Sequence, residues 1–163
     1  MFLKLDENDN FDLSDLKFND PQKNKTHYLI EPNESFHIQL DNINYNDNKF
    51  YLQEREQDFF NKFDTFCVKY INLKSMEWFN KDFSIEKLTK TLQKSNIEES
   101  FLNIEKNNFL IFNQYKTLEK SLNDNEKISL ILEFKGILFY SKTFKLDWNL
   151  VQVKRTLPKS LFI

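Results

Sequence analysis

Two stretches near the end of the chain alternate strictly between apolar and polar residues. Their apolar members are Ile128, Leu130, Leu132 and Phe134 in the first stretch and Phe144, Leu146, Trp148 and Leu150 in the second. A period of two is typical of a half-buried β-strand. The only glycine, Gly136, lies between them, where the lack of a side chain predicts a bend or bulge. We therefore predict two long strands at the centre of a sheet.

From Glu54 the apolar residues recur at helical spacing instead. The apolar residues that share one helical face are Phe59, Phe60, Phe63, Phe66, Cys67, Tyr70 and Ile71. Acidic residues in the first turns suit the positive end of the helix dipole. A second, shorter helix is predicted from Ser84, a favourable N-cap, to about Lys94. Residues 75–81, between the two helices, are predicted to form an aromatic loop.

Shorter alternating segments precede and follow the helices. Before them we predict strands over residues 13–18, 26–30, 35–45 and 49–53, separated by polar and proline-containing turns. After them, residues 101–105 and 109–115 flank Lys106-Asn107-Asn108, which predicts a hairpin, and residues 117–126 form a polar connection. The fold class is therefore α+β, a strongly bent, antiparallel sheet with two helices inserted between strand groups.

At 163 residues the chain has the size of one domain. We expect an acidic leader over residues 1–20, the first strands over 21–53, a helical insertion over 54–94 and the C-terminal strands over 101–155. No apolar run approaches the roughly 18 residues that cross a bilayer, so we expect a soluble, intracellular protein without membrane contact. The single cysteine, Cys67, excludes an internal disulfide. Its apolar neighbours favour a buried structural thiol over a nucleophile.

The sequence contains little that is typical of an enzyme. One glycine and one cysteine exclude a GxGxxG motif, a Gly-rich phosphate loop and a zinc site of the Cys type. His27 and His37 could face each other if their strands pair, but no third metal ligand is recognisable. No Ser/His/Asp arrangement stands out. We therefore predict a protein without enzymatic activity, cofactor or metal.

Charge is unevenly distributed along the chain. Residues 1–60 carry 6 Lys and Arg against 13 Asp and Glu, residues 61–126 carry 10 of each, and residues 127–163 carry 7 against 2. The net charges are −7, 0 and +5, which give the −2 of the whole chain. Such asymmetry is typical of a polyanion-binding face opposite an acidic one. The alternative is a solvated basic strand and an acidic arm, neither of which has a partner.

Lysines and aromatic residues interleave in the basic region. The candidate nucleic-acid-binding residues are Lys135, Phe139, Tyr140, Lys142, Lys145, Trp148, Lys154 and Arg155. Lysines neutralise phosphates, and aromatic faces stack bases for about 1–3 kcal/mol each. The alternative is a core face, because Trp148 alternates in phase with Leu146, and Lys145 then lies on the opposite side of the strand. Nucleic-acid binding and a structural or interaction role therefore both remain open.

Two blocks of the sequence carry a resemblance to a known family. The first is Ser75-Met76-Glu77-Trp78-Phe79-Asn80-Lys81 before a Ser-led helix, and the second is LEFKGILF over residues 132–139 followed by FKLDWNLV over 144–151. Between residues 75 and 155 the chain resembles a family of small proteins of nucleocytoplasmic large DNA viruses, which is likened to phage-type single-stranded-DNA-binding proteins. It departs from the pattern at Asn80, where a glycine is expected, and at Leu138, where a basic residue is expected. The acidic C-terminal tail of the phage proteins is also missing.

The resemblance implies both a fold and a function. The fold is an OB-like β-barrel, which binds strands across its sheet and loops. The function is sequence-tolerant binding of single-stranded DNA in viral DNA replication, recombination or repair. Single-stranded nucleic acid and viral proteins are the expected partners, and the host-cell cytoplasm, the viral factory or the virion is the expected location. The alternative is a non-enzymatic structural or assembly protein, such as a minor virion component, that binds protein partners.

Overall fold

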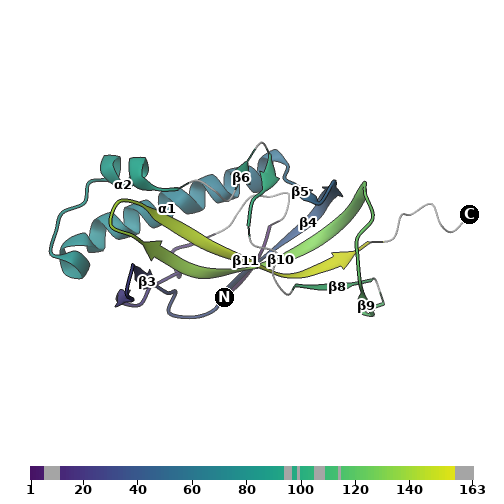
Figure 1. The fold of residues 1–163 in the computed structure, drawn as a ribbon, viewed down its shortest axis with the longest axis horizontal. Coiled ribbons are helices and arrows are strands. Elements are labelled where there is room, and N and C mark those ends of the chain that lie inside the picture. The colour runs from purple at the N-terminus through teal and green to yellow at the C-terminus, as the bar shows by residue number, and fades with distance from the viewer. Residues whose placement is uncertain (6–11, 94–96, 99, 105–108, 114, 157–163) are drawn as a thin grey trace, which may run out of the picture.

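A strongly bent sheet with one long helix along it forms the body of the molecule (Figure 1). The structure, a computed structural model, describes residues 1–5, 12–93, 97–98, 100–104, 109–113 and 115–156. The elements are β1 (Phe2–Lys4), β2 (Gln22–Lys23), β3 (Tyr28–Ile30), β4 (Phe36–Asn46), β5 (Lys49–Tyr51), α1 (Glu54–Phe79), α2 (Ile85–Thr91), β6 (Ile97–Glu98), β7 (Phe101–Leu102), β8 (Leu110–Phe112), β9 (Leu118–Glu119), β10 (Glu126–Phe139) and β11 (Phe144–Arg155). The predicted α+β class, with both helices between strand groups, is confirmed.

The two long C-terminal strands are the centre of the sheet, as the alternating pattern predicts. The strand order is β6-β7-β5-β4-β10-β11-β8-β9, with β1 on β4 and β3 on β10. Pairing is antiparallel except for β1 with β4 and β8 with β11. Within the described ranges no pairing joins β6 to β9, so the sheet is open and bent rather than a closed barrel.

Gly136 produces the predicted bulge. The register between β10 and β11 shifts between Phe134 and Gly136, and Gly136 has a φ of 141°. A Cβ atom at this position would lie 2.6 Å from the backbone oxygen of Ile30 on β3. The glycine therefore allows β3 to approach β10 closely while the long hairpin bends.

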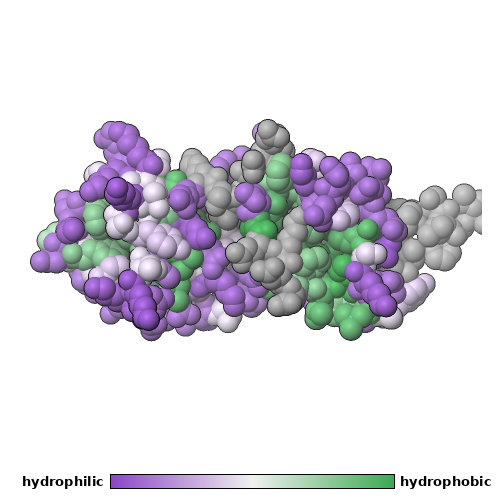
Figure 2. Space-filling model, in the orientation of Figure 1, coloured by the Kyte–Doolittle hydropathy of each residue, from purple (hydrophilic) through white to green (hydrophobic). Residues whose placement is uncertain are grey.

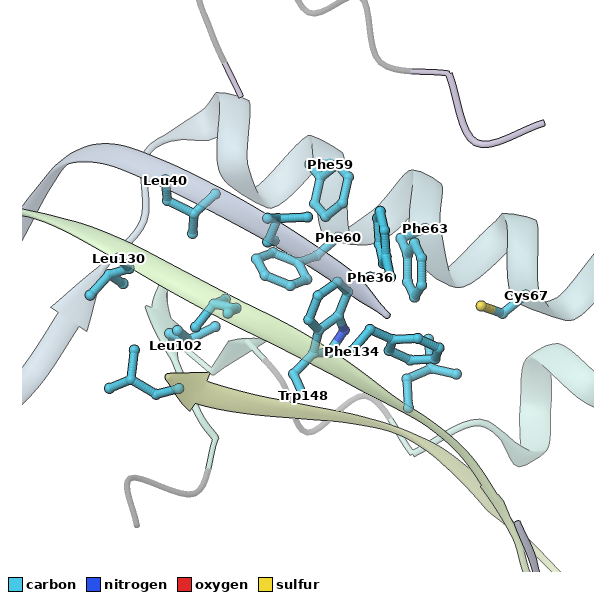
Figure 3. Close-up of a cluster of buried hydrophobic side chains, with 14 of the residues drawn as sticks. Phe36, Leu40, Phe59, Phe60, Phe63, Cys67, Leu102, Leu130, Phe134 and Trp148 are labelled. Carbon is cyan, nitrogen blue, oxygen red and sulfur yellow. The ribbon is translucent and has the colours of Figure 1, made fainter. Parts of the chain in front are cut away.

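The core lies between α1 and the sheet and is largely aromatic (Figure 3). Phe63 on α1 packs against Trp148 on β11, with ring centroids 5.0 Å apart, and against Phe134 on β10 at 4.9 Å. It also stacks on Phe36 of β4 at 5.8 Å. Cys67 is fully buried on the same helical face, which agrees with the structural thiol predicted from the sequence.

Three elements differ from the prediction. The hairpin predicted from residues 101–105 and 109–115 does not form in the described part of the sheet, because β7 pairs with β5 and β6 whereas β8 pairs with β11 and β9. Residues 13–18 form a turn instead of a strand, and Leu13, Leu16 and Phe18 are inserted into the core from it. Residues 75–79 are the last turns of α1 instead of a loop. The predicted turn at 106–108, part of the leader at 6–11 and the segment from Leu157 lie outside the described residues.

Polar contacts explain why α1 continues through Phe79. The Oγ of Ser75 donates to the carbonyl of Asn72 and accepts from the N–H of Phe83, while the Nδ2 of Asn72 donates to the Phe83 carbonyl. These bonds hold the connection to α2 against the helix. Because Ser75 points inward and the larger Leu73 points outward, at 81% exposure, the apolar pattern does not indicate a helix here.

Candidate nucleic-acid interface

A groove lies at the tip of the β10–β11 hairpin. Its walls are the turn after β2 (residues 23–28), the end of α1 with the segment that follows (77–83), α2 and the β10–β11 turn (139–143). Its volume is about 780 Å³. We call it the hairpin-tip groove. The groove lies at the left end of the molecule, where Figure 1 shows α2 above and β3 below. In Figure 2, hydrophilic residues surround residues of intermediate hydropathy and hydrophobic residues at this end.

Local hydrogen bonds shape two of the walls. The turn after β2 is closed by the N–H of Asn24, which donates to the carbonyl of His27 at 2.8 Å. Helix α1 ends at Asn80, whose φ of 53° is left-handed and whose N–H donates to the Met76 carbonyl. Glycine favours this backbone conformation and asparagine tolerates it. This geometry accounts for the asparagine at a position where the resemblance expects glycine.

Five lysines surround the groove without carboxylate partners. They are Lys23, Lys25, Lys81, Lys87 and Lys142, and all five are exposed. No ion pair to any of them is found in the described part of the chain. Among the described lining residues Glu77 alone is acidic, and Lys74 already pairs with it at 3.2 Å. The groove therefore has a concentrated positive potential.

Half-buried aromatic rings form the inner surface of the groove. Phe79 stacks on Phe139 with centroids 4.9 Å apart, and Phe83 lies 5.7 Å from Phe79 and 5.8 Å from Phe139. The Nζ of Lys87 lies 5.3 Å above the ring of Phe83. At the rim, the rings of His27 and Tyr140 are 5.1 Å apart and bridge the two turns. Cationic groups and π-faces are thus within one cavity.

The structure divides the sequence-predicted site residues into two groups. Phe139, Tyr140 and Lys142 line the hairpin-tip groove. The other five, which do not line it, are Lys135, Lys145, Trp148, Lys154 and Arg155. Phe144 and Arg155 lie at opposite ends of β11, roughly 36 Å apart at the usual rise per residue of a strand. The eight residues therefore do not form one compact site.

Several of the residues outside the groove already have other roles. Trp148 is 2% exposed in the core, so its ring cannot stack on a base in this structure, and the stacking role that we predicted for it is wrong. Lys135 pairs with Glu133 at 3.6 Å, and Arg155 pairs with Glu126. Lys145 is half-buried and Lys154 is exposed near the far end of the hairpin.

Four of the groove lysines could not be predicted from the sequence as one site, because they come from three separate segments. Lys23 and Lys25 precede β3, Lys81 follows α1, and Lys87 lies on α2. The antiparallel pairing of β3 with β10 brings the first of these segments to the hairpin. Residues 75–81, which end in Lys81, are indicated only by the resemblance to the viral family. That resemblance is the sequence signal that points to this part of the groove.

The two histidines do not meet. His27 is at the groove, whereas the Nε2 of His37 on β4 lies 3.9 Å from a carboxylate oxygen of Glu133. The described residues contain no group of three His, Cys, Asp or Glu side chains suited to a metal ion. They also contain no helix long and apolar enough to span a membrane.

Residues 34–161 match the model of a family of unknown function, DUF5871, so the chain belongs to that family. No curated protein matches the chain. Two solved structures are similar to it. One, a single-stranded DNA-binding protein from bacteriophage Enc34 in complex with ssDNA, is 11% identical, covers 92% of this chain and 99% of its own, and has a TM-score of 0.44. The other, of the same phage protein, is 12% identical, covers 90% and 93%, and has a TM-score of 0.42.

Proposed function

We propose that this protein binds single-stranded nucleic acid, DNA foremost, in the hairpin-tip groove, without enzymatic activity. The observation that supports this proposal most strongly is the set of five lysines around an aromatic surface, none of which pairs with a carboxylate among the residues that the structure describes. Lysines can neutralise successive phosphates, and only unpaired bases expose the faces that aromatic rings stack on. Stacking accepts every base, so the binding is sequence-tolerant.

Titration with a thymidine oligonucleotide tests the proposal and locates the site. The groove variant Lys81→Gln/Lys142→Gln should bind at least tenfold more weakly than the wild type, because two phosphate contacts are lost. The matched control Lys135→Gln/Lys154→Gln removes the same charge from the strand positions predicted from the sequence. If the control loses as much affinity as the groove variant, total charge rather than the groove determines binding, and if only the control loses affinity, the strands bind the nucleic acid.

Salt dependence provides a second test. Each neutralised phosphate on a single strand contributes about −0.7 to the slope of log K against log salt, so the five lysines set a limit of about −3.5. Lys142→Gln should make the slope shallower by about 0.7. A slope that is unchanged in this variant would remove Lys142 from the phosphate contacts.

The cellular role that we propose is support of DNA replication, recombination or repair in a large DNA virus. The two sequence blocks that resemble viral proteins support this context. We accordingly propose the viral factory or host-cell cytoplasm as the location, and packaging in the virion as the alternative that the same measurement distinguishes. Immunolocalisation in infected cells, together with labelled nascent DNA, tests it. Recovery from purified virions but not from replication sites would contradict a replication role.

A structural or assembly role is the second candidate. The observation that favours it is a group of exposed apolar side chains on β8, β9 and the turn between them, with Leu110 at 50%, Tyr115 at 72% and Leu118 at 61% exposure. Hydrophobic atoms gather over these strands at the lower right of Figure 2. Apolar surface of this kind is typical of protein contacts. This role predicts co-purification with capsid proteins and no measurable affinity for oligonucleotides.

A further inference from the structure

The first wall of the hairpin-tip groove is held on a very short strand. Lys23 and Lys25 lie in or directly after β2, which has only two residues and pairs only with β3 in the described part of the sheet. Its register consists of Gln22 opposite Leu29 and Lys23 opposite Tyr28. Two pairs of this kind fix the position of a turn weakly. Contacts outside β2 must therefore hold this wall against the end of α1.

One side-chain hydrogen bond joins the segment just before this wall to α1. The indole Nε1 of Trp78 donates to the Oδ1 of Asp20 at 3.1 Å, and Asp20 precedes β2 by one proline. The segment before it is anchored as well, because the N–H of Phe18 donates to the hydroxyl of Tyr70 on α1 at 3.3 Å. The ring of Trp78 lies against the ring of Tyr70, with centroids 5.8 Å apart.

We infer that Asp20 and Trp78 are positioning residues of the nucleic-acid site, an inference that rests on the proposed function. Their hydrogen bond, together with the contact between the rings of Tyr28 and Phe79, whose centroids lie 5.3 Å apart, sets the distance between the wall that bears Lys23 and the wall that bears Lys81. Asp20 is an acidic residue beside a groove that binds a polyanion. Its charge opposes binding, whereas its hydrogen bond supports binding.

Because these two effects are opposite, the direction of the change in oligonucleotide affinity in one variant distinguishes them. If Asp20 acts only through its charge, Asp20→Ala should strengthen binding of a thymidine oligonucleotide of about 12 nucleotides. If Asp20 positions the wall, the same variant should bind roughly threefold to tenfold more weakly, the usual effect of losing one hydrogen bond. Asp20→Asn removes the charge but keeps an acceptor oxygen, and it should bind at least as tightly as the wild type.

Two further variants complete the test. Asp82 lies between Lys81 and Phe83 and makes no hydrogen bond or ion pair in the described part of the chain. Asp82→Ala therefore removes the same charge without removing a contact, and it should strengthen binding. Trp78→Phe keeps an aromatic face but loses the N–H donor. It should weaken binding at least as much as Asp20→Ala, because the opposing charge of Asp20 remains, and the double variant should be no weaker than Trp78→Phe alone. Tighter binding by Asp20→Ala, or additive losses in the double variant, would overturn the inference.

A spectroscopic measurement separates this inference from the proposed function. In the free protein, Asp20→Ala should accelerate solvent exchange of the Trp78 indole N–H and shift the amide resonances of residues 22–28, while the indole N–H of buried Trp148 is unchanged. A wild type that does not bind oligonucleotide refutes the proposed function, and the exchange measurement then decides the structural part. No change in either signal would overturn it.

Discussion

The lysines at the groove differ from other lysines of the same elements in what surrounds the ammonium group. On α2, Lys87 lies over the Phe83 ring and has no carboxylate partner in the described chain, whereas Lys90 pairs with Glu86 at 3.1 Å. The two residues share a helix and are both exposed. Since a cation that is already neutralised gains less from a phosphate, position rather than residue type decides which lysine can contribute to the proposed binding.

This pair gives a matched comparison of single substitutions. Lys87→Gln should weaken oligonucleotide binding by roughly threefold to tenfold at low salt, because one phosphate contact is lost. Lys90→Gln should change the affinity by less than about twofold. Fluorescence anisotropy at two salt concentrations measures both values. Equal losses in the two variants would show that only the total charge of α2 matters.

Replacement of Gly136 is expected to destabilise the fold at one place, the close approach of β3 to β10. Gly136→Ala places a Cβ atom 2.6 Å from the Ile30 oxygen at a φ of 141°, which side chains rarely adopt. We expect a loss of about 2–4 kcal/mol in the free energy of unfolding. Urea denaturation measures it, with Ser141→Ala at the exposed hairpin turn as the control. A loss below about 0.5 kcal/mol would mean that β3 moves away from β10 without cost.

At the scale of elements, long regular patterns were predictable and contacts between distant segments were not. Strands β10 and β11 and most of α1 follow from strict periodicity, and the bulge follows from the only glycine. The end of α1 was missed because the inward residue is Ser75, held by a hydrogen bond that only tertiary structure supplies. The groove was missed in part because the pairing of β3 with β10 joins residues more than 100 positions apart.

Helix α1 also determines the chemistry of the only thiol. Burial between the helix and the sheet raises the pKa of the Cys67 thiol well above its ordinary value of 9.0, and the nearby Asp64 raises it further. We expect Cys67 to react with a thiol reagent only when the protein opens, so that labelling is slow in buffer and fast in denaturant. Rapid labelling of the folded protein would show that α1 leaves the sheet readily.

The same pKa shift predicts a pH dependence of stability. Below about pH 9 the thiol is protonated in both the folded and the unfolded chain, so it contributes no slope. Above that pH the unfolded chain loses the proton while the folded protein retains it, so stability falls as pH rises. Urea denaturation between pH 8 and about 10.5 should therefore show a steeper decline for the wild type than for Cys67→Val. Parallel curves would contradict a raised thiol pKa.

At the scale of the whole molecule, the two tryptophans report on different regions. Trp148 is enclosed by core rings at the centre of the sheet, whereas Trp78 lines the groove. Saturating oligonucleotide should quench the emission of Trp78 and leave that of Trp148 unchanged. In Trp78→Phe we therefore expect blue-shifted emission that does not respond to oligonucleotide at any concentration. Quenching that persists in this variant would place the bound strand near the core.

The two ends of the sheet path, β6 and β9, have two residues each. A chain with 18 phenylalanines would be at risk of aggregation if a long edge strand offered its backbone to another molecule. At these two ends an incoming strand finds few hydrogen bonds with which to add to the sheet. The two ends of the sheet path thus add little capacity to template fibrils to a molecule with a large aromatic core.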